Sequence, residues 1–195
     1  MASPILRLFL GVTAAIIFIA IFTPTESVTS VAQSFTMPLA LRNLEVVISQ
    51  EEKNPVLMRT AVKNNNDHPV TILSYGSPLD ALAIQLGTLY ITPKGGSEPL
   101  EILQIEASRL WPPMEDALIE LGAGQTAIWE STLQEPVVPM DSVFEGATVQ
   151  LKGTWTAVWP REKEGIDFSE LEEGTPINGT LTGSYKSNVL DIEVA

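Results

Sequence analysis

The sequence places three asparagines, an aspartate and the chain's single histidine in one run, Asn64 to His68. A histidine beside a carboxylate can act as a general base or contribute to a metal site, and Asp67 directly precedes His68. Neighbouring residues of an extended chain point to opposite sides, however, and no second histidine exists to complete a common zinc site. Asparagine-rich runs favour turns through local side-chain hydrogen bonds. We therefore interpret this run as a hairpin turn between two strands.

A second group of potential ligands is the acidic stretch at residues 161–175. Calcium could be gathered there by the carboxylates of Glu162, Glu164, Asp167, Glu170, Glu172 and Glu173. The stretch lacks the alternating Asp and Asn pattern of a calcium loop, and like charges repel each other and stay hydrated. We expect a solvated surface loop. Nothing fixes two carboxylates at the separation that glycoside hydrolysis requires, so a weak acidic hydrolase is the least favoured class of function.

Tryptophan is the third residue type that could form a site, because indole rings stack on sugars and anchor protein partners. Trp155 lies on the apolar side of an alternating segment, which favours a core position. Trp111 precedes Pro112 and Pro113 in a predicted crossover, so we expect Trp111 to be exposed and these three residues to form a binding surface. Asn178 begins an Asn-Gly-Thr sequon and is the predicted glycosylation site of a secreted chain.

The composition of the chain excludes several function classes. The net charge of -13, from 24 acidic and 11 basic residues, opposes binding to nucleic acid or to anionic lipid. The absence of cysteine excludes disulfides, a thiolate nucleophile and zinc sites with thiolate ligands. We predict no metal, no cofactor and no enzymatic activity.

The first 32 residues have the pattern of a targeting segment. Arg7 supplies a short positive region, and Leu8 to Phe22 forms the hydrophobic region of a secretory signal peptide. Small residues place the cleavage after Ala32, with Ser27 and Ser30 as rival sites. A span of about 20 apolar residues crosses a bilayer, so an uncleaved signal anchor is the alternative. We expect a secreted protein or a single-pass membrane protein whose C-terminal domain lies outside the cytosol.

Alternation of apolar and polar residues dominates the rest of the chain and predicts β-strands. The clearest example is residues 148–159, in which one face carries the apolar side chains. Similar segments are residues 43–50, 55–64, 69–75, 88–93, 100–107, 117–121, 125–133 and 179–194. Their spacing of about 8 to 12 residues indicates a sandwich or barrel, and short links favour two packed antiparallel sheets.

The connections between these segments carry their own signals. Glycines in Pro93–Gly96 and in Leu121–Gln125 predict two further hairpin turns. Leucines at helical spacing in Ser77–Gly87, followed by a glycine at the C-cap position, predict one or two turns of helix.

Several of these segments resemble a known family. LEVVISQ, AVKNNNDHPVTIL, GSPLDALAIQLGTLYIT and IELGAGQTAIWESTL are similar to secreted fungal Ig-like sandwich proteins that resemble the prosequence of deuterolysin-type metalloproteases. The likeness covers residues 44–160 and includes Asn64 at a strand end, Pro78–Asp80 before the next strand, and the turn at Leu121–Gly124. The chain has neither the HExxH zinc helix nor the cysteines of the protease. The resemblance therefore implies only a prosequence-like domain, with an inhibitory or folding-assistant role.

The resulting prediction divides the chain into two parts. Residues 1–32 form a signal peptide or anchor helix, and residues 33–195 form a single all-β domain, an Ig-like antiparallel β-sandwich of about 7–9 strands. The predicted function is that of a non-catalytic secreted or cell-surface module that binds another protein, with a protease as the partner that the resemblance implies. A carbohydrate-binding module that uses Trp111 is the alternative, and no nucleic-acid partner is expected.

Overall fold

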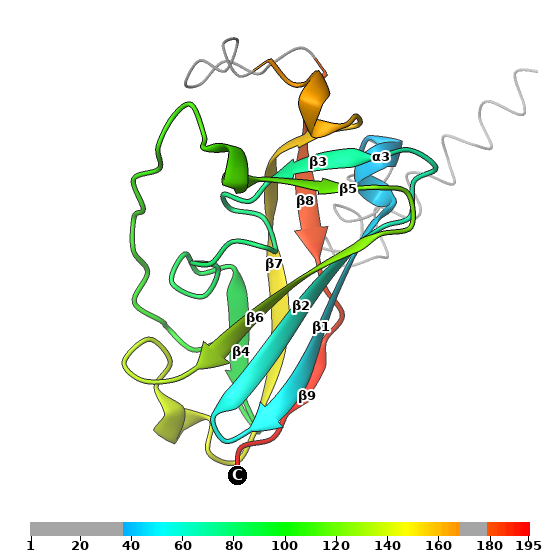
Figure 1. Cartoon of the computed structure of the whole chain (residues 1–195). Coiled ribbons are helices and arrows are strands. Elements are labelled where there is room, and N and C mark those ends of the chain that lie inside the picture. The colour runs from blue at the N-terminus through cyan, green and yellow to red at the C-terminus, as the bar shows by residue number, and fades with distance from the viewer. Residues whose placement is uncertain (1–36, 168–178) are drawn as a thin grey trace, which may run out of the picture. The chain divides into compact units, whose positions relative to one another are not determined.

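The computed structural model of the chain describes residues 37–167 and 179–195 (Figure 1). The predicted signal or anchor segment, the sequon residue Asn178 and residues 168–175 of the acidic stretch lie outside the described residues. Contacts separate Met1–Met37 from a second compact unit, Pro38–Ala195, whose fold is described below.

The described residues form two antiparallel sheets. The three-stranded sheet has the order β1 (Leu44–Lys53), β2 (Val56–Asn64) and β6 (Thr126–Leu133). The six-stranded sheet is built around β7 (Ala147–Trp159), which pairs with β4 (Leu89–Pro93), β3 (Val70–Leu73), β8 (Leu181–Lys186) and β9 (Leu190–Ile192). Strand β5 (Leu118–Leu121) pairs with β3. The prediction of an all-β antiparallel sandwich is confirmed.

The alternating pattern correctly identifies the buried face of β7. Trp155, Val149 and Leu151 are buried in the core, as the two-residue period predicts. Trp155 retains only 1% of its surface and lies beside the ring of Tyr185, with 5.0 Å between the ring centroids. The core position predicted for this tryptophan is therefore confirmed.

One predicted strand does not form. Residues 100–107 run as an extended connection between β4 and β5 and have only isolated backbone hydrogen bonds to the rest of the fold. The amide of Leu100 donates to the carbonyl of Ile91 at 2.7 Å, and that of Ile105 donates to Gln85 at 3.0 Å. Two separated bonds do not make a ladder, so the strand prediction for this segment is wrong.

Helical structure is limited to short pieces in the described residues. These are α3 (Leu39–Arg42) and three single turns of 3₁₀ helix, η1 (Glu115–Ala117), η2 (Met140–Ser142) and η3 (Lys163–Gly165). The helix predicted at residues 77–87 is limited to one turn, in which the amide of Leu86 donates to the carbonyl of Leu82 at 2.8 Å and Gly87 follows with a φ of 73°, as predicted for a C-cap glycine. The residues before it form tight turns. Side chains compete for the backbone donors there, since Ser77 accepts from the amide of Leu79 and Asp80 from that of Leu82.

Asn64, at the end of β2, braces two crossings between the sheets. Its fully buried side chain donates to the carbonyls of His68 at 2.9 Å and Leu121 at 2.9 Å, and to Gly122 at 3.2 Å. Its amide oxygen accepts from the backbone and the side chain of Asn66. The asparagine run therefore has a structural role in the corner of the sandwich.

The three predicted hairpins are not hairpins. Residues 65–69 lead from β2 in one sheet to β3 in the other, and Leu121–Gln125 leads from β5 back to β6. Pro93–Gly96 reverses the chain after β4 but opens into the long connection that precedes β5. Turn residues specify a local change of direction, and Gly124 adopts a φ of 74°, but they do not specify which sheet the next strand joins.

The outer edge of β1 is covered by the C-terminal segment. The backbone amide of Ile48 donates to the side chain of Asn188 at 2.8 Å, and the Asn188 amide donates back to the Ile48 carbonyl at 3.1 Å. Gln50 makes the same reciprocal pair with the backbone of Glu193, at 2.6 and 3.0 Å. Lys53 adds an ion pair with Glu193. Two side-chain amides thus substitute for a neighbouring strand and join the two sheets.

Candidate binding site at the β6 edge

Strand β6 forms the other edge of the three-stranded sheet. It pairs with β2 along its whole length, from Thr126 opposite Lys63 to Leu133 opposite Val56. No other strand of the described residues pairs with it, and Figure 1 shows β6 running alongside β2. The strand contains no proline and a single charged residue, Glu130. Its outer backbone groups therefore have no strand partner within the described residues.

Exposed apolar side chains gather along this edge. The side chain of Ile128 is 56% exposed and that of Trp129 is 40% exposed. Within the described residues, six of the eleven large apolar side chains classed as exposed lie in β6 or in the connection before β5: Leu103, Ile105, Leu110, Met114, Ile128 and Trp129. Of these six, Met114, Ile128 and Trp129 line one cavity, and a group of exposed apolar side chains is typical of an interaction surface.

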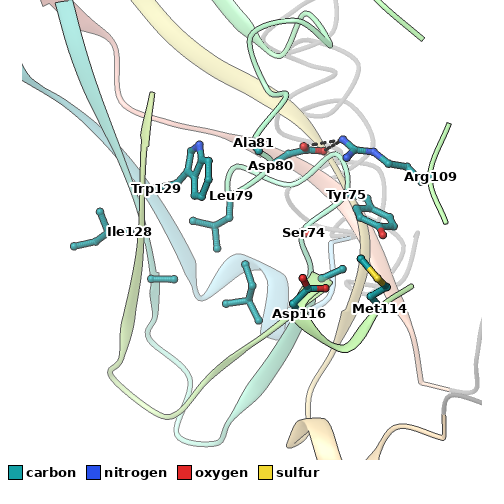
Figure 2. Close-up of a pocket in the computed structure, with 13 residues that line it drawn as sticks. Ser74, Tyr75, Leu79, Asp80, Ala81, Arg109, Met114, Asp116, Ile128 and Trp129 are labelled. Atoms are coloured by element: carbon teal, nitrogen blue, oxygen red, sulfur yellow. Dashed lines mark hydrogen bonds and ion pairs between the residues drawn. The ribbon is translucent and has the colours of Figure 1, made fainter. Parts of the chain in front are cut away.

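A cavity of about 550 Å³ opens beside the inner face of β6. Figure 2 shows Trp129 and Leu79 on one side of this cavity, with Tyr75 and Met114 on the other. Ile128 points away from the other labelled residues, as alternation along a strand requires. We call strand β6 together with this cavity the β6 edge surface.

An ion pair between buried Asp80 and partly exposed Arg109 fixes the wall of the cavity opposite β6. Asp80 retains 2% of its surface, and Nη2 of Arg109 donates to its two carboxylate oxygens at 2.6 and 2.7 Å. The backbone amides of Gly76 and Leu82 donate to the same carboxylate at 2.6 and 2.9 Å. The Arg109 guanidinium lies 4.8 Å from the centre of the Tyr75 ring. These contacts attach the connection before β5 to the loop after β3.

The two carboxylates that line the cavity differ in their partners. The carboxylate of Asp80 is occupied by four donor contacts, and its charge is balanced by Arg109. Asp116 is exposed and, among the residues that the structure describes, has no hydrogen-bond or ion-pair partner. Within residues 37–167 and 179–195, no three His, Asp or Glu side chains come together as a metal site.

Asp67 and His68 do make contact, contrary to the expectation from an extended chain. Nδ1 of His68 lies 2.8 Å from Oδ1 of Asp67, because the chain turns at this point. The hydrogen bond to His68 lowers the pKa of the Asp67 carboxyl. Both side chains are exposed, at the crossing that Asn64 braces from within. The pair lies on a loop surface, outside the cavity.

The three residues of the predicted binding surface differ in exposure. Trp111 is half-buried against a core cluster that includes Trp159, and Pro113 is buried, whereas Pro112 is exposed. The expectation that Trp111 is the exposed tryptophan is wrong, because Trp129 is the most exposed of the four. The binding role of Trp111, Pro112 and Pro113 stays a prediction, and the proposed glycan on Asn178 lies outside the described residues.

The sequence contained a partial signal for the site. Alternation predicts that Trp129 lies on a strand, but no local signal indicates that this strand lies at an edge. Asp80 was marked by the resemblance, whereas its partner Arg109 lies 29 positions away and has no pattern of its own. Pairing over such a distance depends on the course of the intervening chain.

The geometry defines a class of protein, a two-sheet antiparallel β-sandwich with an edge strand beside a cavity that has both apolar and charged lining residues. The chain belongs to the immunoglobulin-like domain family, because the model of that family matches residues 43–194. It is also 31% identical over 143 residues to an uncharacterized secreted protein of Arthroderma benhamiae, an alignment that covers 71% of this chain and 69% of the relative. In residues 37–167 and 179–195, no helix has the length and apolarity needed to cross a bilayer.

Proposed function

We propose that this protein is a non-catalytic, secreted or cell-surface Ig-like domain that binds another protein through the β6 edge surface. The observation that carries the proposal is the concentration of exposed apolar side chains beside an open strand edge and a cavity. Apolar and aromatic side chains at the centre of a contact, with polar groups around them, are typical of protein interfaces. The similarity to a relative named as a secreted protein supports the extracytoplasmic location.

A prosequence-like role toward a metalloprotease is the finer version of this proposal. It is supported by the resemblance of the segments around Asn64, Asp80 and the turn at Leu121–Gly124. The family model and the relative name no protease. Inhibition or assisted refolding of secreted metalloproteases by the purified chain would therefore be a separate measurement from binding itself.

Carbohydrate binding is a second candidate function, because one observation favours it. The indole of Trp129 is partly exposed in the same cavity as the Tyr75 ring, and aromatic faces stack on sugar rings. A glycan array probed with the full chain and with Trp129→Ala separates this candidate from protein binding. A glycan signal that disappears in the variant would replace the protein-binding proposal.

The main test compares two charge substitutions at exposed apolar residues. The full chain and its Ile128→Asp variant are expressed through a secretory pathway, cross-linked to extracellular protein from the same source and quantified by mass spectrometry. Phe144→Asp is the matched control, because Phe144 is 73% exposed and lies outside the β6 edge surface. We expect a defined partner that is retained by Phe144→Asp and lost by Ile128→Asp. Equal recovery with both variants, or no partner at all, would contradict the proposal.

A further inference from the structure

The β6 edge lacks the devices that usually protect a strand edge. Natural sheets block such edges with prolines, lysines, bulges or covering segments, because unpaired backbone groups attract other strands. In β6 the one charged side chain, Glu130, is held at 2.9 Å by Arg59 of the neighbouring strand β2. The register of β6 with β2 continues without a bulge over its full length. The strand therefore offers a straight row of backbone donors and acceptors.

Side-chain contacts are available on both faces of an added strand. Alternate residues of such a strand would point inward toward the cavity and outward toward solvent. The inward positions meet Trp129 and Leu79, which line the cavity. The outward positions meet Ile128, which continues a cross-strand row through Ala61 to Val47. A segment with apolar residues on both faces fits this edge.

The charges around the β6 edge favour a partner segment with a positive charge. Asp80 is neutralised by Arg109, so Asp116 is the carboxylate of the cavity wall that has no partner in the described residues. Arg59 is shared between Glu130 and Glu51, at 2.9 and 3.0 Å, which leaves this trio with a net negative charge. The chain as a whole carries a net charge of -13. A segment with basic residues is therefore attracted.

The same charges disfavour a second copy of this chain at the edge. Two copies would each bring a strongly negative surface, and β6 itself contains no lysine or arginine to offset Glu130. Pairing of β6 with its own copy would place two unprotected edges together but would supply no complementary charge.

We propose that the partner binds as an extended segment that adds a fourth strand along β6, with an apolar side chain in the cavity and a basic residue beside Asp116. The inference rests on the proposed function, since it names how the β6 edge surface binds its partner. Backbone hydrogen bonds supply the affinity in this mode, and the cavity and the carboxylate supply the selectivity.

A random peptide library tests this mode without knowledge of the natural partner. Peptides of about nine residues, comparable in length to β6, are displayed on phage and selected on the full chain. We expect enrichment of alternating apolar sequences that contain lysine or arginine and lack proline. Hydrogen exchange should show new protection at Thr126–Leu133, with Leu44–Lys53 unchanged. Failure to enrich any peptide, or protection elsewhere, would overturn the strand-addition mode.

N-methylation of the selected peptide separates backbone pairing from side-chain contact. Methyl groups on one alternating set of amides remove the donors that face β6, and methyl groups on the other set remove donors that face solvent. We expect about a tenfold loss of affinity for each hydrogen bond lost with the first set and almost no loss with the second. Equal effects of the two sets would overturn the proposal, even if the Ile128→Asp capture experiment still shows a partner.

The charge preference has its own matched pair of variants. Asp116→Asn should weaken the selected basic peptide about threefold to fivefold, whereas Asp141→Asn, which removes the same charge from η2, should leave the affinity unchanged. Equal losses would show that only net charge matters and would overturn the assignment of Asp116.

Sedimentation of the full chain tests whether a second copy of the chain binds at the β6 edge instead. A dimer that Ile128→Asp dissociates would place a second copy on the edge and overturn the proposal.

Discussion

The two edge strands of the three-stranded sheet differ in whether another segment pairs with their outer backbone groups. At β1, side-chain amides of Asn188 and Gln50 pair with backbone groups and close the edge against the C-terminal segment. A register shift between Gln50 and Glu52 adds a bulge to the same strand. At β6, no described segment pairs with the outer backbone, and the register is regular.

This difference indicates that β6, and not β1, is the edge at which a further strand can bind. An open edge promotes aggregation, so a domain that can close one edge with two amides has a simple means of closing another. The exposed side chains of β1 near its bulge are charged, and they include Glu51, Glu52 and Lys53. Those of β6 include Ile128, and Trp129 extends over the cavity. The open edge and the apolar surface therefore coincide, which is the arrangement that recognition of a strand requires.

The largest expected effect comes from removing the ion pair behind the β6 edge. Asp80→Ala leaves the half-buried amides of Gly76 and Leu82 without their acceptor and leaves Arg109 without its partner. Because Arg109 is partly exposed, solvent compensates part of the loss, and we expect a decrease in the free energy of unfolding of about 2–4 kcal/mol. Urea denaturation of the full chain measures this change. The cavity wall should loosen as well, so the selected peptide should bind more weakly.

Asp116→Ala is the matched control for that variant, because it removes a carboxylate from the same cavity. Asp116 is exposed and has no partner in the described residues, so its loss should change the free energy of unfolding by less than about 0.5 kcal/mol. If the two alanine variants unfold at the same urea concentration, the wall does not depend on Asp80.

The next effect tests whether β1 is closed by its amide pairs. Asn188→Ala removes both hydrogen bonds to Ile48, whose backbone groups would then be exposed to exchange. We expect a loss of about 1–2 kcal/mol in the free energy of unfolding and faster hydrogen exchange at the Ile48 amide. Val189→Ala, at the exposed neighbouring position, should have almost no effect. Unchanged exchange at Ile48 in Asn188→Ala would show that the edge is closed by other contacts.

The sequence was informative about strands and their buried faces because both depend on local order. Alternation alone identified β7 with Trp155 in the core, and it identified β6 with Trp129 on it. The same rule failed at residues 100–107, where alternation is present but no neighbouring strand lies within reach of a continuous ladder. A strand requires a partner, and the partner is not encoded in the segment itself.

The candidate site was harder to predict for the same reason. Whether β6 is an edge depends on where the crossings at Asn64 and at Leu121–Gln125 send the chain, and these were interpreted as hairpins. The Asp80 and Arg109 pair joins two loops that are distant in the sequence. The two prolines after Trp111 predict that this tryptophan is exposed, but they lead the chain back into the core, where Pro113 is buried.

A smaller effect on stability, but a large one on binding, is expected for Trp129→Ala. The indole is partly exposed and lies at the rim of the cavity, so the free energy of unfolding should fall by less than about 1 kcal/mol. Leu133→Ala on the same strand is the contrasting variant: Leu133 is buried in the core, and its truncation should cost about 2–5 kcal/mol. Binding of the selected peptide should be lost in Trp129→Ala. A variant that is destabilised as strongly as Leu133→Ala would mean that Trp129 is part of the core.

The smallest effect concerns pH and acts on the closed edge alone. The hydrogen bond and the charge of Lys53 lower the pKa of Glu193 below its ordinary value of 4.5. Because the pKa is lower in the folded protein than in the unfolded chain, the ion pair stabilises the fold above the unfolded pKa, and this contribution is lost as the pH falls through the folded pKa. Hydrogen exchange, corrected for its intrinsic pH dependence, should therefore show less protection at the C-terminal end of β1 in acid, with no matching change in β6. Lys53→Met removes the cation that lowers the pKa of Glu193, so this loss of protection should disappear in that variant. Persistence of the acid effect in Lys53→Met would assign it to another carboxylate of the closed edge.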